Sequence, residues 1–150
     1  MSTLGSKPIN YGQANGGKVN VEIQLAASVA FKYLGGKFVS LDSSEQAALT
    51  VASDTRIFGW ADAGEFTSSA TAGNDKVSVN VSREAQYWMP ASAAVTRDLV
   101  GKTCDVNVAS GIQQATVTLS TRDVLKIWDV DIPNQLVLVS IIDTAQTGVI

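Results

Sequence analysis

The chain has 150 residues, a formal charge of −3 at pH 7, one cysteine and no histidine. A chain of this length can bury a core without a staple, and a single cysteine excludes both an internal disulfide and a multi-cysteine metal site. The absence of histidine removes the commonest acid–base group, and the acidic balance gives no general attraction to nucleic acid or anionic lipid. No apolar run approaches the ~20 residues of a membrane span. We therefore expect a protein made in a cytoplasm, with neither nucleic acid nor membrane as a partner.

Residues 1–17 are expected to form a flexible or extended N-terminal arm. They contain five Gly or Pro residues and follow neither a strand nor a helix period. Pro8, Ile9 and Tyr11 are candidate anchors for a partner. Two interpretations stay open: a terminus that is disordered in isolation, and a segment that becomes ordered on a binding partner.

The clearest strand spans residues 18–25. Val19, Val21 and Ile23 alternate with polar residues, so one face is apolar and the other faces water or a polar partner. This pattern is typical of an antiparallel strand near the edge of a sheet. Together with the arm, these three side chains are the candidate partner-binding residues.

The middle of the chain reads as a β-meander. Short apolar segments at 38–41, 47–52, 57–61 and 77–81 alternate with turn signals, the first of them Gly35-Gly36. Gly59, inside a strand, indicates a bulge or a close backbone approach. A further strand ends at Pro90, which lacks a backbone donor.

The second half continues in the same style. Residues 92–100 predict a two-turn helix, with Ser92 as N-cap and Gly101 as the residue after its end. Segments 105–108, 115–119 and 123–131 predict strands, and 135–143, apolar on both faces, predicts a central strand. Residues 18–150 are therefore expected to form one mainly β domain, a small sandwich or barrel with one short helix.

No reaction centre emerges from these residues. Asp129 and Asp131 would share a strand face, but two ligands are too few for a hard cation. The Gly101-Lys102-Thr103 run lacks the earlier glycine of a phosphate loop, and Cys104 has no histidine to activate it. We expect no enzyme activity, no cofactor and no metal.

The aromatic residues admit two interpretations. They could form a stacking platform for sugars or single-stranded nucleic acid, which would call for interleaved basic residues. Packing in the core or at a subunit contact is favoured instead. The candidate subunit-contact residues are Phe58, Trp60 and Trp88.

Four stretches of this sequence resemble the capsid decoration (cement, head-stabilising) proteins of tailed bacteriophages. They are GGKFVSLDSSEQAALTVASDTRIFGWADAGEF, DKVSVNVSREAQYWMP, LVGKTCDVNV and STRDVLKIWDVD. The family pattern of a Gly-led apolar strand, a stretch of small residues, an I-G-x-A strand and a Val-rich strand matches residues 36–41, 47–52, 57–61 and 74–81. The resemblance covers about residues 18–142. Trp60 departs from it, because a smaller residue is expected there.

The resemblance implies a β-tulip-like domain on the exterior of a virion, made in the host bacterial cytoplasm. Such a protein would clamp neighbouring major capsid subunits, often as a trimer, with an arm that completes a sheet of the capsid protein. A carbohydrate-binding or adhesive β module on a virion or cell surface is the alternative that the aromatic content raises.

Overall fold

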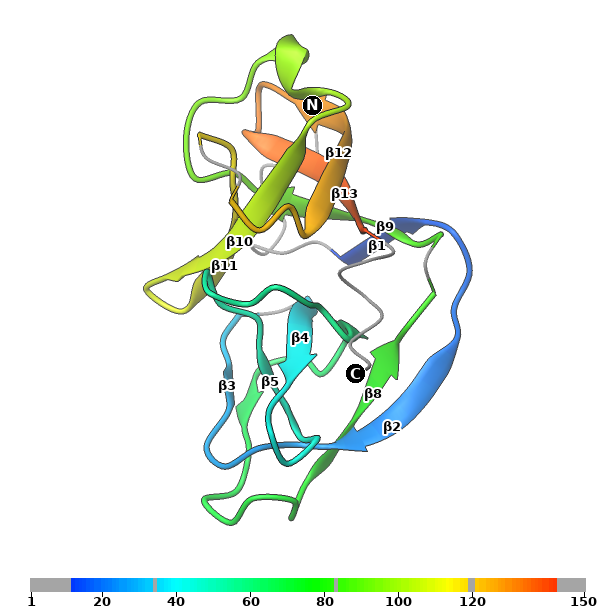
Figure 1. Cartoon of the computed structure of the whole chain (residues 1–150), viewed down its shortest axis with the longest axis vertical. Coiled ribbons are helices and arrows are strands. Elements are labelled where there is room, and N and C mark those ends of the chain that lie inside the picture. The colour runs from blue at the N-terminus through cyan, green and yellow to red at the C-terminus, as the bar shows by residue number, and fades with distance from the viewer. Residues whose placement is uncertain (1–11, 34, 83, 119–120, 143–150) are drawn as a thin grey trace.

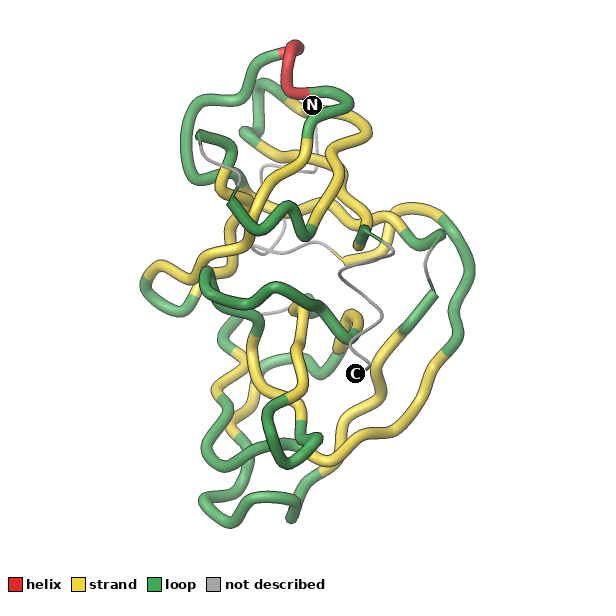
Figure 2. Tube along the Cα trace, in the orientation of Figure 1, coloured by secondary structure: helices red, strands yellow, loops and turns green. Residues whose placement is uncertain are grey.

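The structure is a computed structural model that describes residues 12–33, 35–82, 84–118 and 121–142. The described chain is mainly β, with almost no helix (Figures 1 and 2). The strands are β1 (Gly12–Asn15), β2 (Asn20–Gln24), β3 (Ala30–Phe31), β4 (Lys37–Leu41), β5 (Ala47–Leu49), β6 (Gly59–Ala61), β7 (Phe66–Thr67), β8 (Lys76–Asn80), β9 (Gln86–Pro90), β10 (Thr103–Ala109), β11 (Ile112–Thr116), β12 (Leu125–Asp131) and β13 (Leu136–Ile141).

Six of these strands form a nearly closed, barrel-like sheet in the order β1-β9-β13-β12-β10-β11. All its strand pairs are antiparallel. A single parallel bridge between Ala91, just after β9, and Ala115 on β11 brings the two ends of the sheet together. This sheet occupies the upper part of Figure 1.

The lower part of Figure 1 contains a second sheet of five antiparallel strands, in the order β2-β8-β6-β4-β5. Its two ends also approach each other, through a parallel bridge between Leu25 and Ala47. The Ala26 N–H donates to the Ala47 carbonyl at 3.0 Å beside this bridge. Strands β3 and β7 form a separate pair in which the rings of Phe31 and Phe66 stack.

The five-stranded sheet is inserted between two adjacent strands of the six-stranded one. The chain leaves β1 through residues 16–19, builds β2 to β8, and returns to β9 through residues 81–85. These two crossings touch: a Cβ on Gly16 would lie 2.4 Å from the Glu84 carbonyl oxygen, and Gly16 has φ +86°. Only glycine fits this crossing without displacing its neighbour.

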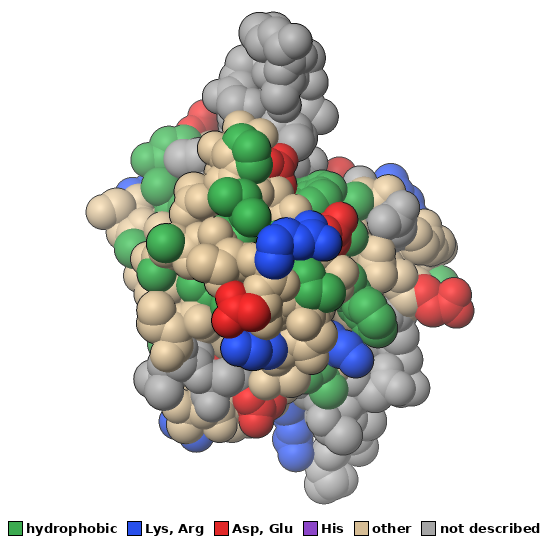
Figure 3. Space-filling view, turned by 90° about the horizontal axis from the view of Figure 1, so that it is seen from above, with side chains coloured by type: hydrophobic (Ala, Val, Ile, Leu, Met, Phe, Trp, Pro, Cys, Tyr) green, Lys and Arg blue, Asp and Glu red, His purple; other side chains and the backbone are tan. Residues whose placement is uncertain are grey.

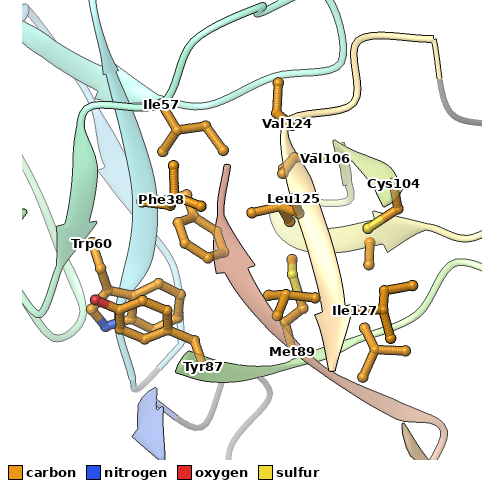
Figure 4. Packing of buried hydrophobic residues seen from close by; sticks show 14 of the residues in the cluster. Phe38, Ile57, Trp60, Tyr87, Met89, Cys104, Val106, Val124, Leu125 and Ile127 are labelled. Atoms are coloured by element: carbon orange, nitrogen blue, oxygen red, sulfur yellow. The ribbon is translucent and has the colours of Figure 1, made fainter. Parts of the chain in front are cut away.

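Each large sheet has its own hydrophobic core, and three aromatic rings join the two sheets. Phe38 and Trp60 come from the five-stranded sheet and Tyr87 from β9, yet all three belong to the core of the six-stranded sheet (Figure 4). The Trp60 ring stacks on Tyr87 at 4.4 Å between centroids and meets Phe38 edge-on at 4.8 Å. Such pairs add to the stability that burial alone provides.

A buried glutamine completes the connection between the sheets. Gln113 on β11 accepts from the Phe38 N–H at 2.8 Å through Oε1, and its Nε2 donates to the carbonyls of Phe38 at 2.8 Å and Thr50 at 3.1 Å. One side chain thereby satisfies three backbone groups of the opposite sheet, groups that would be costly to leave unpaired in the interior.

Glycines make room for the bulky Trp60. A Cβ on Gly36 would lie 2.3 Å from the Trp60 Nε1 atom, so the absence of a side chain at position 36 creates the space for the indole. Gly59 shows the predicted close backbone approach, since a Cβ there would lie 2.6 Å from both the Asn80 carbonyl oxygen and the Val79 side chain.

The helix prediction requires correction. The two-turn helix at 92–100 is replaced by a single 3-10 turn, η2 (Arg97–Leu99). The oxygen of the predicted N-cap, Ser92 Oγ, accepts from the Val117 N–H instead, and the Thr96 backbone is extended, with φ −132° and ψ 161°. Within the predicted arm, residues 12–15 form β1, which pairs with β9.

A β-bulge changes which residues of β12 face the core. The β12–β13 register shifts between Ile127 and Asp129. Simple alternation from Ile127 would turn Asp129 and Asp131 inward. The extra residue places Val130 in the core instead and turns both carboxylates outward.

Candidate binding surface

Strand β2 lies at the edge of the five-stranded sheet, as its sequence pattern predicts. The Val81 N–H donates to the Val19 carbonyl, and the Leu25 N–H donates to the Asp75 carbonyl. Odd-numbered residues of β2 therefore direct their backbone groups at β8. The N–H and C=O groups of residues 20 and 22 point to the opposite edge. This edge meets β5 at the end of β2, through the Leu25–Ala47 bridge, and beside residues 20 and 22 the described chain places no paired strand.

The apolar side chains of β2 extend the core towards this edge. Val21 and Ile23 lie opposite Val79 and Val77, which are buried. Ile23 is half-buried, whereas Val21 is 39% exposed and Val19 57% exposed. The apolar face that the sequence pattern predicts is therefore covered at Ile23 and uncovered at Val19 and Val21.

The start of β2 is held in place by Asn80. Its Oδ1 accepts from the backbone N–H groups of Val19 at 3.1 Å and Ser82 at 3.0 Å, and its Nδ2 donates to the Gly17 carbonyl at 3.3 Å. The exposed valines thus stand on a fixed backbone. An ordered strand loses less entropy on binding than a loop would.

The other candidate anchors divide between the core and undescribed residues. Pro8, Ile9 and Tyr11 lie outside the described residues. Trp60 is a core residue, because its indole is enclosed between Phe38 and Tyr87, and this corrects its assignment to a subunit contact. Phe58 is half-buried against the core of the five-stranded sheet.

Trp88 and Trp128 lie on the outer face of the six-stranded sheet. Trp88 is half-buried, and it alternates with Tyr87 and Met89, which face the core. Trp128 is 45% exposed and its indole N–H donates to the Ser140 Oγ at 2.8 Å. Trp128 was not selected from the sequence as a contact residue, although simple alternation with the core residue Ile127 already turns it outward.

The surface around Trp128 carries both acidic and basic side chains. The Lys126 Nζ lies 4.5 Å from the centroid of the Trp128 ring, within cation–π range. Arg97 and Asp129 form an exposed ion pair at 3.5 Å. Figure 3, which views this end of the molecule from above, shows acidic and basic side chains interspersed with hydrophobic ones.

The three tryptophans do not form one stacking platform. Trp60 is enclosed in the core, Trp88 is half-buried, and the face of the Trp128 ring is in contact with the Lys126 ammonium group. A sugar-binding surface of the kind considered from the sequence would need several free aromatic faces.

Burial shifts the pKa values of two interior side chains, Lys37 and Cys104. Lys37 is fully buried and its Nζ has no hydrogen-bond partner among the described residues; burial lowers its pKa to about 8, against a smaller opposing effect of Glu65. Burial, with the nearby charges of Asp105 and Asp123, raises the pKa of the Cys104 thiol to about 12. Such a thiol is a poor nucleophile.

The carboxylates serve structural roles. The Asp105 carboxylate accepts from the backbone N–H groups of Thr121, Arg122 and Asp123 and fixes the loop before β12. Asp131 accepts from the side chain of Asn134 within the β12–β13 turn. Across the described ranges, no three acidic or cysteine side chains gather closely enough to hold a metal ion.

No helix within the described part of the chain is long and apolar enough to cross a membrane. No family model, curated protein or solved structure matches this chain.

Proposed function

We propose that this chain is a structural virion protein that binds the outer surface of a capsid and stabilises it by clamping neighbouring major capsid subunits. The observation that carries the proposal is the β2 edge. It combines outward-pointing backbone groups with the exposed valines 19 and 21 on a fixed strand. Strand addition uses such an edge, with backbone bonds for affinity and alternate side chains for specificity.

The resemblance to decoration proteins supplies the identity of the partner, the major capsid protein. It also supplies the finer description of the fold as β-tulip-like, the trimeric state and the location on the virion exterior. A clamp of this kind needs no catalytic group. Many copies in a lattice would sum individually weak contacts into a large stabilisation of the shell.

The arm in this proposal consists of residues 1–11, since β1 belongs to the folded domain. Pro8, Ile9 and Tyr11 are its anchors. Deletion of residues 1–11 should weaken capsid binding and leave the β sheets intact, as far-UV circular dichroism would report. Unchanged capsid affinity after this deletion would remove the arm from the proposal.

The edge can be tested at a single backbone atom. Glu22→Pro removes the backbone N–H of residue 22, which points outward from β2. The hydrogen bonds between β2 and β8 stay in place, because the backbone groups of residue 22 point away from β8. Glu22→Ala is the matched control, which removes the same side chain and keeps the N–H. Binding to decoration-free capsids should fall in the proline variant alone.

The expected loss for one or two strand hydrogen bonds and a displaced partner strand is about 10-fold in affinity, since 1.4 kcal/mol corresponds to a factor of about ten. Equal binding by both variants would contradict strand addition at β2. Failure of the unmodified protein to bind capsids or to raise their melting temperature at micromolar concentration would overturn the proposed function itself.

A further inference from the structure

The exposed start of β2 carries an apolar pair on one face and two opposite charges on the other. Val19 is 57% exposed and Val21 is 39% exposed. Lys18 and Glu22 lie on the opposite, polar face, because side chains alternate along a strand, and both are exposed. Within the described chain neither charge has an ion-pair partner. The segment thus presents unmatched groups of three kinds: apolar, basic and acidic.

The backbone edge of the same segment is open around Asn20. The Val81 N–H donates to the Val19 carbonyl, so Val19 directs its backbone groups at β8. The backbone groups of Lys18, Asn20 and Glu22 therefore point away from β8, to a side where the described chain places no paired strand. In Figure 1 strand β2 runs along the lower right margin of the molecule, with β8 on its inner side.

We propose that two copies of this chain pair through this edge, as antiparallel strands related by a two-fold axis at Asn20. Val19 of each copy then lies opposite the partner's Val21, and Lys18 lies opposite the partner's Glu22. The pairing covers the exposed valines with each other and sets opposite charges face to face, and both kinds of cross-strand pair are stabilising. A two-fold interface is self-complementary, so each of these contacts occurs twice.

The closed end of the β2 edge is compatible with this register. The bridge between Leu25 and Ala47 brings β5 against the edge at the end of β2. The paired segment of the partner ends beside Glu22, so it stops short of this bridge. The next residue of the partner is Gly17, which has no side chain to crowd the edge, and there the chain turns towards β1.

Other registers of the same pairing are less favourable. A two-fold axis at Glu22 would place two glutamates face to face, and an axis at Lys18 would do the same with two lysines. Like charges directly opposite each other destabilise a strand pair. An axis at Val21 would carry the paired strands as far as Gln24, where β5 closes the edge. The charges, the valines and the length of the open edge thus select one register.

The dimer is expected to be weak and to depend on concentration. Five residues of each copy take part, fewer than the roughly 20–30 a side of a standard interface. The ion pairs are exposed, so salt screens them. Association should therefore appear at low ionic strength and at protein concentrations on the order of 100 μM.

This inference concerns the isolated protein and does not depend on the proposed function. If both hold, the dimer covers the edge that a capsid strand would use, and it lowers the apparent capsid affinity. A trimer on the capsid would have to form through another surface. The two proposals can fail separately, because dimerisation is measured without capsids and capsid binding is measured at concentrations where the protein is a monomer.

Exchange of the two charges tests the pairing in the full chain. Lys18→Glu and Glu22→Lys each set like charges face to face at two positions of the dimer. Each variant alone should show a dissociation constant at least about 10-fold higher in sedimentation equilibrium. In an equimolar mixture the glutamates of one variant face the lysines of the other, so a mixed dimer should form about as tightly as the unmodified one. Lys76→Glu, at an exposed position of β8, is the control and should dimerise normally.

The mixture also separates the pairing from a protective role of the charges, since charged residues on an edge strand commonly prevent association. Recovery of the dimer in the mixture would show that both variants are folded and that the two residues meet across the interface. Unmodified protein that stays monomeric at about 1 mM would overturn the inference. An oligomer that neither charge variant weakens, or single variants that associate more tightly than the unmodified protein, would overturn it as well.

Discussion

Replacement of Lys37 by methionine is expected to stabilise the protein. Lys37 is fully buried at the start of β4, and its ammonium group has no hydrogen-bond partner among the described residues. Burial disfavours the charged form and lowers the pKa from 10.5 to about 8. Methionine fills a similar volume without a charge.

The magnitude follows from the pKa difference between the two states. Below pH 8 the amine is protonated in both the folded and the unfolded chain, and the folded chain bears the cost of burying the charge. A difference of about 2.5 pKa units corresponds to about 3.4 kcal/mol. Lys37→Met should recover most of this at pH 7, about 2–3 kcal/mol, which is a rise in Tm of roughly 5–10 °C.

The same difference predicts a pH dependence whose sign is fixed. Burial lowers the pKa of Lys37 in the folded chain, so the folded chain is more stable at high pH, where the amine is neutral. This part of the stability is lost as the pH falls from 10.5 through about 8. Between pH 7 and pH 9 Lys37 should contribute a gain of about 1.3 kcal/mol to the unmodified protein. Cys104 opposes part of this gain near pH 9, because its thiol, with an ordinary pKa of 9.0, ionises in the unfolded chain and not in the folded one. The opposing part is the same in Lys37→Met, so the difference between the two proteins isolates the lysine.

Urea unfolding at pH 7 and pH 9 measures both effects, with Lys76→Met as the control at an exposed strand lysine. The control should change neither the stability at pH 7 nor the gain at pH 9. A Lys37→Met protein that is less stable than the parent, or that keeps the full gain between pH 7 and pH 9, would refute the reasoning. Either result would mean that the amine is stabilised by a contact that the described residues do not provide.

Three further predictions concern the interior. Gly36→Ala should lower the free energy of unfolding in urea by about 1–3 kcal/mol, because the new Cβ would overlap the Trp60 indole and the Ala61 carbonyl. Gly17→Ala should be tolerated, because a Cβ at position 17 has no neighbouring atom within 4 Å. Gln113→Ala should cost about 3–4 kcal/mol by the same measurement, since the Phe38 N–H and the Thr50 carbonyl lose the amide as their partner and the Phe38 carbonyl keeps only the Thr50 N–H. The half-buried neighbour Gln114→Ala should cost much less. Cys104 should react with a thiol reagent only after unfolding, because burial raises its pKa to about 12.

Contrary results would be equally specific. A stable Gly36→Ala protein would mean that the indole has another position available to it. Equal losses for the two glutamine variants would show that the contact between the sheets does not depend on the amide. Rapid labelling of the native thiol would indicate opening of the core on the timescale of the reaction.

Alternation along the sequence was enough to predict several strands and the edge position of β2. The valines of β2 and β8 repeat every second residue, and this period directly reflects one buried face. The mainly β character follows from the same periodicity. The pattern could not show that the outer half of the β2 face stays uncovered, because coverage depends on what lies opposite in space.

The errors arose where tertiary contacts override local signals. Residues 92–100 carry helix-end signals, yet the Ser92 Oγ accepts from the Val117 N–H and the Thr96 backbone is extended. The outward direction of Asp129 and the full burial of Lys37 could not be predicted for a related reason. The bulge in β12 and the burial of an amine in β4 are set by neighbouring strands, and neither leaves a trace in its own segment.

The insertion of one sheet within the other imposes an order on folding during synthesis. Strand β1 is made first, but its partner β9 follows only after the whole of β2 to β8 has been made. The inserted strands can pair with one another as they leave the ribosome, while β1 must wait for a contact across about seventy residues. Closure of the outer sheet is thus the late, slow step. The two short crossings at Gly16 and Ala85, which already touch, determine whether that step places β1 correctly.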